Sequence, residues 1–178
     1  KLAQEKEGYL YPETYFFPPN VTTEKDIVDR LTLAFEQTIA KPMDAEIKDW
    51  SARTGRDLSD LMTMASILEE EVRTTEDKKI VADLLWRRIK EGMPLQVDAT
   101  LAYVIHKTSA QMTLADLKKD NPYNTYTNKG LPPGPISNPS KDSILAAMNP
   151  TPNKYVFYLS DKDGITHFSK TLDEHNRL

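Results

Sequence analysis

The stretch that decides the fold is Asp57-Leu58-Ser59-Asp60-Leu61-Met62-Thr63-Met64-Ala65-Ser66-Ile67-Leu68-Glu69-Glu70-Glu71-Val72, which predicts a buried helix. Apolar side chains recur along it at alternating spacings of three and four residues, at Leu58, Leu61, Ala65, Leu68 and Val72. This spacing places a continuous apolar stripe on one face of an α-helix. Asp57 precedes the stripe and suits the N-cap position, so we expect a helix over 57–72.

Helices are expected on both sides of this stretch, because capping residues and apolar periodicity recur. The further expected helices are 23–40, 44–53, 74–91, 99–106 (capped by Asp98), 113–119 and 140–148. Strands are expected near the two ends. The aromatic stretch 8–17 predicts an edge strand, and two apolar runs flanking Asp161-Lys162-Asp163-Gly164 predict a β-hairpin.

Residues 121–140 are rich in Pro and Gly and predict a long Pro-rich loop. The expected fold class is therefore α+β: a helical body with a small antiparallel sheet and this loop. A chain of 178 residues suits one domain, which we expect over 1–178.

Composition excludes several classes of function. The chain has a net charge of −4, which argues against a general nucleic-acid binder. It has no cysteine, which excludes disulfides, zinc thiolate sites and a thiol nucleophile. The three histidines, His106, His167 and His175, show no metal-ligand spacing, so no metal site is expected.

Three consecutive carboxylates, Glu69, Glu70 and Glu71, end the expected helix over 57–72. Successive residues turn by about 100°, so the three do not share a face. Glu70 points away from the apolar stripe, whereas Glu69 lies at its edge, where partial desolvation would raise the pKa of its carboxyl group. A raised pKa suits a general acid, which makes Glu69 the candidate catalytic residue. The alternative is a structural ion pair between Glu69 and Arg73, four residues further on.

Two other segments carry side chains that suit a carbohydrate groove. Asp98 is best explained as a helix cap, but Gln96 has no such role and could bind a sugar hydroxyl or amide group. Asn124 and Tyr126 lie beside the Pro-rich loop, and amide groups and aromatic faces on a stiff backbone favour sugar binding. The alternative for Asn124 is a hydrogen bond within its own turn.

Several motifs follow one another in a set order along almost the whole chain. They are Glu7-Gly8-Tyr9-Leu10-Tyr11-Pro12-Glu13-Thr14-Tyr15, Ala65-Ser66-Ile67-Leu68-Glu69-Glu70-Glu71, Leu95-Gln96-Val97-Asp98-Ala99-Thr100, Tyr123-Asn124-Thr125-Tyr126, Gly130-Leu131-Pro132-Pro133-Gly134-Pro135-Ile136, and His167-Phe168 with Glu174-His175-Asn176. In this order they resemble the endolytic murein transglycosylase (YceG-like) family. The chain departs from the family pattern at Glu70, where Lys is frequent, and at Ser140, where Gly is common.

The resemblance implies a lytic transglycosylase, a lyase that cleaves the bond between N-acetylmuramic acid and N-acetylglucosamine within peptidoglycan strands and leaves 1,6-anhydro ends. By resemblance Glu69 is catalytic, first as an acid toward the glycosidic oxygen and then as a base toward the muramoyl 6-hydroxyl. One carboxyl group suffices because the substrate supplies its own nucleophile. Gln96, Asn124 and Tyr126 are the expected substrate-binding residues.

The resemblance also implies the surroundings of the site. We expect no cofactor and no metal, with peptidoglycan glycan strands as substrate, cell-wall synthesis proteins as partners and no nucleic acid. The family's membrane helix and LysM-like subdomain would precede residue 1, so this soluble region would work at the extracytoplasmic face of the bacterial membrane.

Two alternatives stay open at this point. One is a muramidase-type hydrolase that uses Glu69 with a second acid such as Asp98. The other is a non-catalytic glycan-binding scaffold domain of a cell-wall synthesis complex. The masses of the digestion products separate all three.

Overall fold

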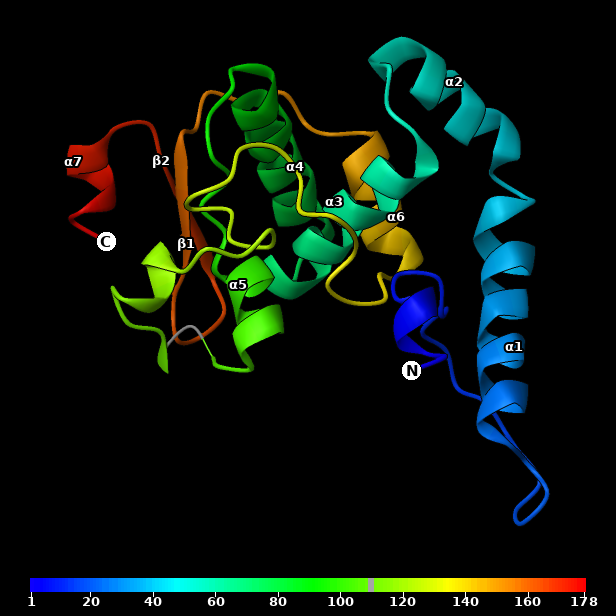
Figure 1. The fold of residues 1–178 in the computed structure, drawn as a ribbon. Helices are drawn as coiled ribbons and strands as arrows, with labels where there is room; N and C mark the ends of the chain where they lie inside the picture. Colours follow the sequence, from blue (N-terminus) through cyan, green and yellow to red (C-terminus); the bar gives the residue numbers. More distant parts are fainter. Residues whose placement is uncertain (109–110) are drawn as a thin grey trace.

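In the computed structural model, which describes residues 1–108 and 111–178, helices pack around α3 and a two-stranded sheet lies to one side (Figure 1). This arrangement confirms the expected α+β fold class. Helices α1 and α2 lie on the side of the body opposite the sheet. The helices outside the C-terminal segment are α1 (Glu24–Phe35), α2 (Asp44–Thr54), α3 (Leu58–Glu71), α4 (Thr75–Lys90), α5 (Asp98–Ile105) and α6 (Lys141–Met148).

Helix α3 forms the centre of the core, as its apolar stripe predicts. The eight residues Leu61–Leu68 are all buried, and α3 packs against α6 and α4. A reciprocal capping box between Asp57 and Asp60 starts the helix. Val72 has extended backbone angles and ends it directly after Glu71.

Other helix boundaries differ in part from the sequence-based expectations. The expected helix over 23–40 is α1 followed by a π-helical stretch, Glu36–Ala40, and the helix over 113–119 is reduced to a 3₁₀ turn, Asp116–Lys118. A further 3₁₀ turn lies at Gln4–Lys6. Asp98 is not the cap of α5, because Val97 holds that position and has no side-chain capping bond.

The predicted hairpin is confirmed. Strands β1 (Phe157–Ser160) and β2 (Thr166–Ser169) pair antiparallel, with Phe157 opposite Ser169, and the short helix α7 (Leu172–His175) follows. Both sides of the hairpin come from the last quarter of the chain, so the sheet forms a flank of the helical body (Figure 1).

The predicted edge strand over 8–17 is wrong. This segment contains a turn and bends and joins no strand, and its backbone donors bind elsewhere. The amide of Tyr11 donates to the Leu31 carbonyl at 3.3 Å. The amide groups of Gly8 and Leu10 donate to Oδ1 of Asn138 at 2.9 and 3.0 Å. Gly8 has a φ of +87°, and a Cβ atom there would lie 2.4 Å from Pro135. The N-terminal segment is therefore fitted closely against the loop over 121–140.

Residues 121–140 run as turns and bends along the helical body. Ser66, buried on α3, fastens the end of this segment. Its hydroxyl accepts the amide of Ile136 at 3.0 Å, and its carbonyl accepts the hydroxyl of Ser137 at 3.2 Å. The segment thereby gains a fixed position beside the last turns of α3.

Candidate active site

A pocket lies where the end of α3 meets β1, α7 and the loop before α5. Its volume is about 630 Å³. One wall is polar, and the hairpin and α7 add an apolar and aromatic wall. The lining residues are Glu70, Glu71, Arg88, Gln96, Asp98, Tyr126, Phe157, Tyr158, Leu159, Ser160, Leu172 and His175.

Two pockets meet at the end of α3. A smaller one, of about 260 Å³, is also lined by Glu70 and Glu71, together with Tyr103 and Ile136 among others. Glu70 is exposed, whereas Glu71 is half-buried. Glu71 therefore contributes to the walls of both pockets.

The environment of Glu71 favours its neutral form. Burial raises the pKa of this carboxyl group above its ordinary value, and the negative charges of Asp98 and Glu70 add to the effect. The hydroxyl of Tyr158, at 2.8 Å, and the amide of Ala99 oppose it by donating hydrogen bonds. The raised pKa favours the neutral carboxyl group, while these donors remain available to its ionised form, a combination that suits alternating acid and base roles.

Gln96 and Tyr126 lie in this pocket together, as the sequence-based hypothesis requires. The amide of Gln96 donates to the Thr125 carbonyl at 3.0 Å, and the amide of Val97 donates to the Thr125 hydroxyl at 3.0 Å. These bonds join the loop before α5 to the segment that carries Tyr126. Gln96 is exposed and has a φ of +53°, a strained conformation that is common in functional loops.

Tyr126 reaches Asp98 across this junction. Its hydroxyl donates to Oδ1 of Asp98 at 2.5 Å. Burial, with the Asp98 charge, raises the pKa of Tyr126 well above its ordinary value, so the phenol stays neutral. The carboxylate of Asp98 is thereby used as a hydrogen-bond acceptor on the pocket wall.

Arg88 forms the floor of the pocket. It is buried, and its guanidinium group donates to the carbonyl oxygens of Leu95 and Val156. Burial lowers the pKa of Arg88 below its ordinary value. An arginine guanidinium group nevertheless stays charged in proteins. It ties the loop before α5 to the strand side of the pocket.

The sequence-based hypothesis for Glu69 meets a different environment. Glu69 does not line either of these pockets. Burial raises its pKa, but hydrogen bonds from Ser143 and Ser140, with the charge of Lys78, outweigh burial and hold the pKa below its ordinary value. The expected raised pKa is therefore wrong. The expected alternative, an ion pair with Arg73, is replaced by one with Lys78 at 3.3 Å.

The expectation for Asn124 is also contradicted. Asn124 has no exposed surface. Its side-chain amide donates to the carbonyls of Leu117 and Lys119 at 3.1 and 2.7 Å, and its Oδ1 accepts the amide of Tyr126 at 3.1 Å. Since Asn124 is buried and its side chain bonds the backbone of Leu117, Lys119 and Tyr126, the structure gives it a structural role that orients Tyr126.

The sequence alone does not select three residues that line this pocket: Glu71, Arg88 and Tyr158. Tyr158 lies in a four-residue strand beside the equally half-buried Phe157, so the local sequence does not separate it from other aromatic residues of the strand. Among the described residues, no group of three or more histidine, aspartate or glutamate side chains is arranged to hold a metal ion. In the same part of the chain, no helix combines the length and apolar character that crossing a membrane requires.

Comparisons with known proteins agree with this fold. Endolytic murein transglycosylases of Bacillus subtilis (strain 168) and Streptococcus pneumoniae serotype 2 (strain D39) are 37% and 32% identical to the chain over 171 and 177 residues. Each alignment covers 96% of this chain, but 46% and 31% of those relatives. The chain thus spans less than half the length of these curated relatives.

A crystal structure of a YceG-like protein of Listeria monocytogenes superimposes with a TM-score of 0.85 at 38% identity. The superposition covers 97% of this chain and 55% of that one. The whole sequence, residues 1–178, matches the YceG-like family. The family match runs from end to end and the fold agrees with a solved relative, so the chain belongs to the YceG-like family.

Proposed function

We propose that this chain carries the active site of a murein lytic transglycosylase, with Glu71 as its acid and base. The observation that carries the proposal is the half-buried carboxyl group of Glu71, whose pKa is raised, at the meeting point of two pockets. The names of the bacterial relatives supply the substrate class, murein. The catalytic role moves from Glu69 to Glu71 because Glu69 is ionised and held away from both pockets.

The proposed reaction needs one carboxyl group. Protonated Glu71 donates its proton to the glycosidic oxygen between N-acetylmuramic acid and N-acetylglucosamine. The resulting carboxylate, held by Tyr158, accepts the proton of the muramoyl 6-hydroxyl as that oxygen bonds to C1. The product is a 1,6-anhydro end, and Glu71 is protonated again. Proximity of the 6-hydroxyl replaces an attacking water molecule.

The pocket walls suggest how a sugar is held. Gln96 offers an exposed amide group, and Tyr126 offers an aromatic edge braced by Asp98. Phe157 and Leu172 supply apolar surface on the opposite wall. Aromatic and apolar faces with a few placed polar groups are what sugar sites use. Because murein lies outside the cytoplasmic membrane, the proposed place of action is its outer face.

One observation favours a second candidate, a hydrolase. Asp98 lies in the same pocket as Glu71, and glycosidases use two carboxyl groups. The bond from Tyr126 to Asp98 argues against a free second base.

The deciding experiment digests purified glycan strands and weighs the products. Anhydro ends support the transglycosylase, and ends heavier by one water support the hydrolase. Glu71→Gln should lower the rate by at least about 10²–10⁴-fold with normal folding. Full activity in this variant would refute the proposed role of Glu71.

A further inference from the structure

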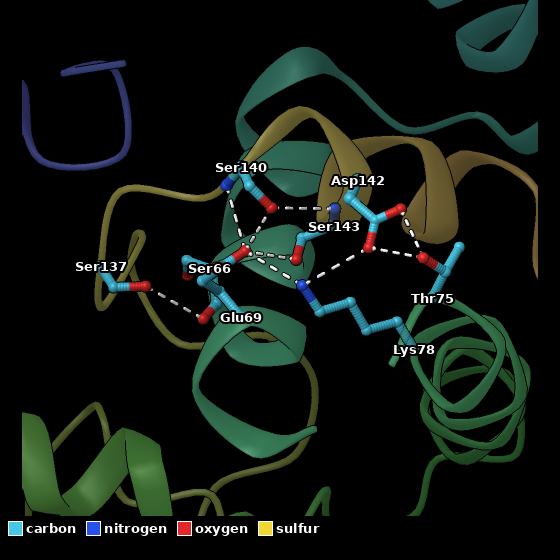
Figure 2. A network of polar contacts seen from close by, with 8 residues as sticks. All are labelled: Ser66, Glu69, Thr75, Lys78, Ser137, Ser140, Asp142 and Ser143. Atoms are coloured by element: carbon cyan, nitrogen blue, oxygen red, sulfur yellow. Dashed lines mark hydrogen bonds and ion pairs between the residues drawn. The ribbon is translucent and has the colours of Figure 1, made fainter. Parts of the chain in front are cut away.

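A second polar cluster surrounds Glu69 on the side of α3 that faces α6 and α4 (Figure 2). Oε2 of Glu69 accepts hydrogen bonds from the amide and hydroxyl of Ser140 at 3.1 and 2.7 Å and from the hydroxyl of Ser143 at 2.5 Å. Lys78 Nζ lies 3.3 Å from the same oxygen. A single carboxylate oxygen therefore joins α3 to the start of α6 and to α4.

The charge of this carboxylate is matched by a buried cation. The Lys78 side chain is only 6% exposed, and its ammonium group lies between Glu69 and Asp142, which is 3.7 Å away. The hydroxyl of Thr75 donates to Asp142 at 2.9 Å and completes the chain of contacts. A buried ammonium group is costly unless it is paired, so Glu69 and Lys78 fix one another in place.

Glu69 and Glu71 hold the same helical turn from opposite sides. Two residues along an α-helix correspond to a rotation of about 200°. Glu69 faces α6, whereas Glu71 bonds Tyr158 on β1. The helix ends at Val72, and a terminal turn frays unless neighbouring elements hold it. The contacts of Glu69 attach this turn to α6 and α4.

The same face of α3 also positions a wall of the smaller pocket. Ser66 lies one turn before Glu69 and accepts the amide of Ile136. Ile136 lines the smaller pocket beside Glu71. Ser140, which bonds Glu69, ends the segment that contains Ile136. Ser66 and Glu69 thus attach this segment at two successive points along α3 (Figure 2).

We propose that Glu69 is a positioning residue that anchors the last turn of α3 to α6 and α4 and so places Glu71 against the bond to be cleaved. This inference rests on the proposed function of Glu71. Glu69 itself touches neither pocket, so it acts through the turn it holds.

The test compares Glu69→Gln and Ser143→Ala with a matched control, Glu76→Gln. Glu76 is an exposed carboxylate paired with Lys79 on α4, so its loss removes equal charge without touching the cluster. We expect Glu69→Gln to lower kcat per folded molecule by about 10–100-fold, since a displacement of about 1 Å has effects of this size. KM should change by less than about twofold, because the Gln96 and Tyr126 walls are held by other bonds. Glu76→Gln should leave both constants unchanged.

The pH dependence of the rate separates a positioning role from a loss of folded protein, because a smaller amount of folded enzyme lowers the rate without shifting the pH at which it falls. If the turn loosens, water reaches Glu71, its pKa falls toward its ordinary value, and the alkaline limb of the rate profile moves to lower pH. Ser143→Ala should give a smaller change in the same direction. It removes one donor and leaves the ion pair with Lys78, so it covers the case in which Glu69→Gln folds poorly.

The possible outcomes distinguish failure of this inference from failure of the proposed function. Unchanged kcat and an unchanged alkaline limb in both variants would overturn the positioning role. Loss of all activity at every pH in Glu69→Gln, with Glu71→Gln fully active, would make Glu69 the catalytic acid and refute both proposals. An active Glu71→Gln together with an unaffected Glu69→Gln would refute the proposed function and, with it, this inference. An inactive Glu71→Gln with an unaffected Glu69→Gln refutes the inference alone.

Discussion

Tyr158 and Glu71 join β1 to the end of α3 through a hydrogen bond of 2.8 Å from the phenol hydroxyl to Oε2 of the carboxyl group. The bond stabilises the ionised form of Glu71, so it opposes the rise in pKa that burial produces. Tyr158 itself stays neutral, because burial and the nearby Glu71 charge raise its pKa well above its ordinary value. The pair therefore sets the pH above which Glu71 can no longer act as an acid.

Tyr158→Phe should move the alkaline limb of kcat/KM to higher pH. Removing the donor destabilises the carboxylate, and the pKa of Glu71 rises further. A hydrogen bond to a charged group is worth about 1.5–3 kcal/mol, which corresponds to a move of about one pH unit or more. The measurement is a pH–rate profile on purified glycan strands. Tyr155→Phe, on the residue whose ring stacks on Phe168, is the control and should leave the limb in place. A limb that moves to lower pH would contradict the assigned contact.

Asn124→Ala should lower stability and leave activity per folded molecule nearly intact. Asn124 is fully buried, and the change would leave two carbonyl groups and one amide without their partner. Each buried unsatisfied group costs about 1–3 kcal/mol. Chemical denaturation measures the loss. Asn128→Ala is the control in the same segment, because Asn128 is exposed and water replaces its bonds. A stable Asn124→Ala with low turnover would return Asn124 to the substrate site.

The stabilising effect of Glu69 should depend on pH in one direction. Its pKa in the folded protein is lower than its ordinary value of 4.5, so its contribution is fully present above that value and disappears as pH falls through the lowered one. The difference in unfolding free energy between the native chain and Glu69→Gln should be about 1–3 kcal/mol at pH 7. It should shrink toward zero in a denaturation series taken down to about pH 2. A difference that grows on acidification would mean that the pKa is raised.

Local patterns predict most of the helices of this chain because helix caps and apolar periodicity depend on residues close together in sequence. The cap at Asp57 and the apolar stripe that follows it determine α3 without help from other segments. The expected strand over 8–17 failed because its backbone donors bind Asn138, 128 and 130 residues away, which no local pattern reports.

The sequence predicts candidate site residues from their residue types alone. Gln96 and Tyr126 are two such candidates; they line one pocket, and their contact with sugar stays a prediction. The choice between Glu69 and Glu71 depended on partners far along the chain. Tyr158 is 87 residues from Glu71, and Ser143 is 74 residues from Glu69. A helical projection of α3 contains neither partner, so it could not give the direction of either pKa.

Asp98→Asn should move the alkaline limb to lower pH while the products keep their anhydro ends. The negative charge of Asp98 helps to raise the pKa of Glu71, so its removal lets that pKa fall and Glu71 loses its proton earlier as pH rises. Asparagine keeps an oxygen that can accept the hydroxyl of Tyr126, so the pocket wall should stay in place. Asp120→Asn is the control. It removes the same charge from an exposed residue directly before the loop over 121–140, and it should leave the pH–rate profile unchanged. If Asp98 were instead the second carboxylate of a hydrolase, Asp98→Asn would be nearly inactive at every pH, and the native chain would release ends heavier by one water. pH–rate profiles and product masses taken from one digestion series distinguish the transglycosylase from the hydrolase. The transglycosylase predicts a shifted alkaline limb and anhydro products. The hydrolase predicts a loss of rate at every pH and products heavier by one water.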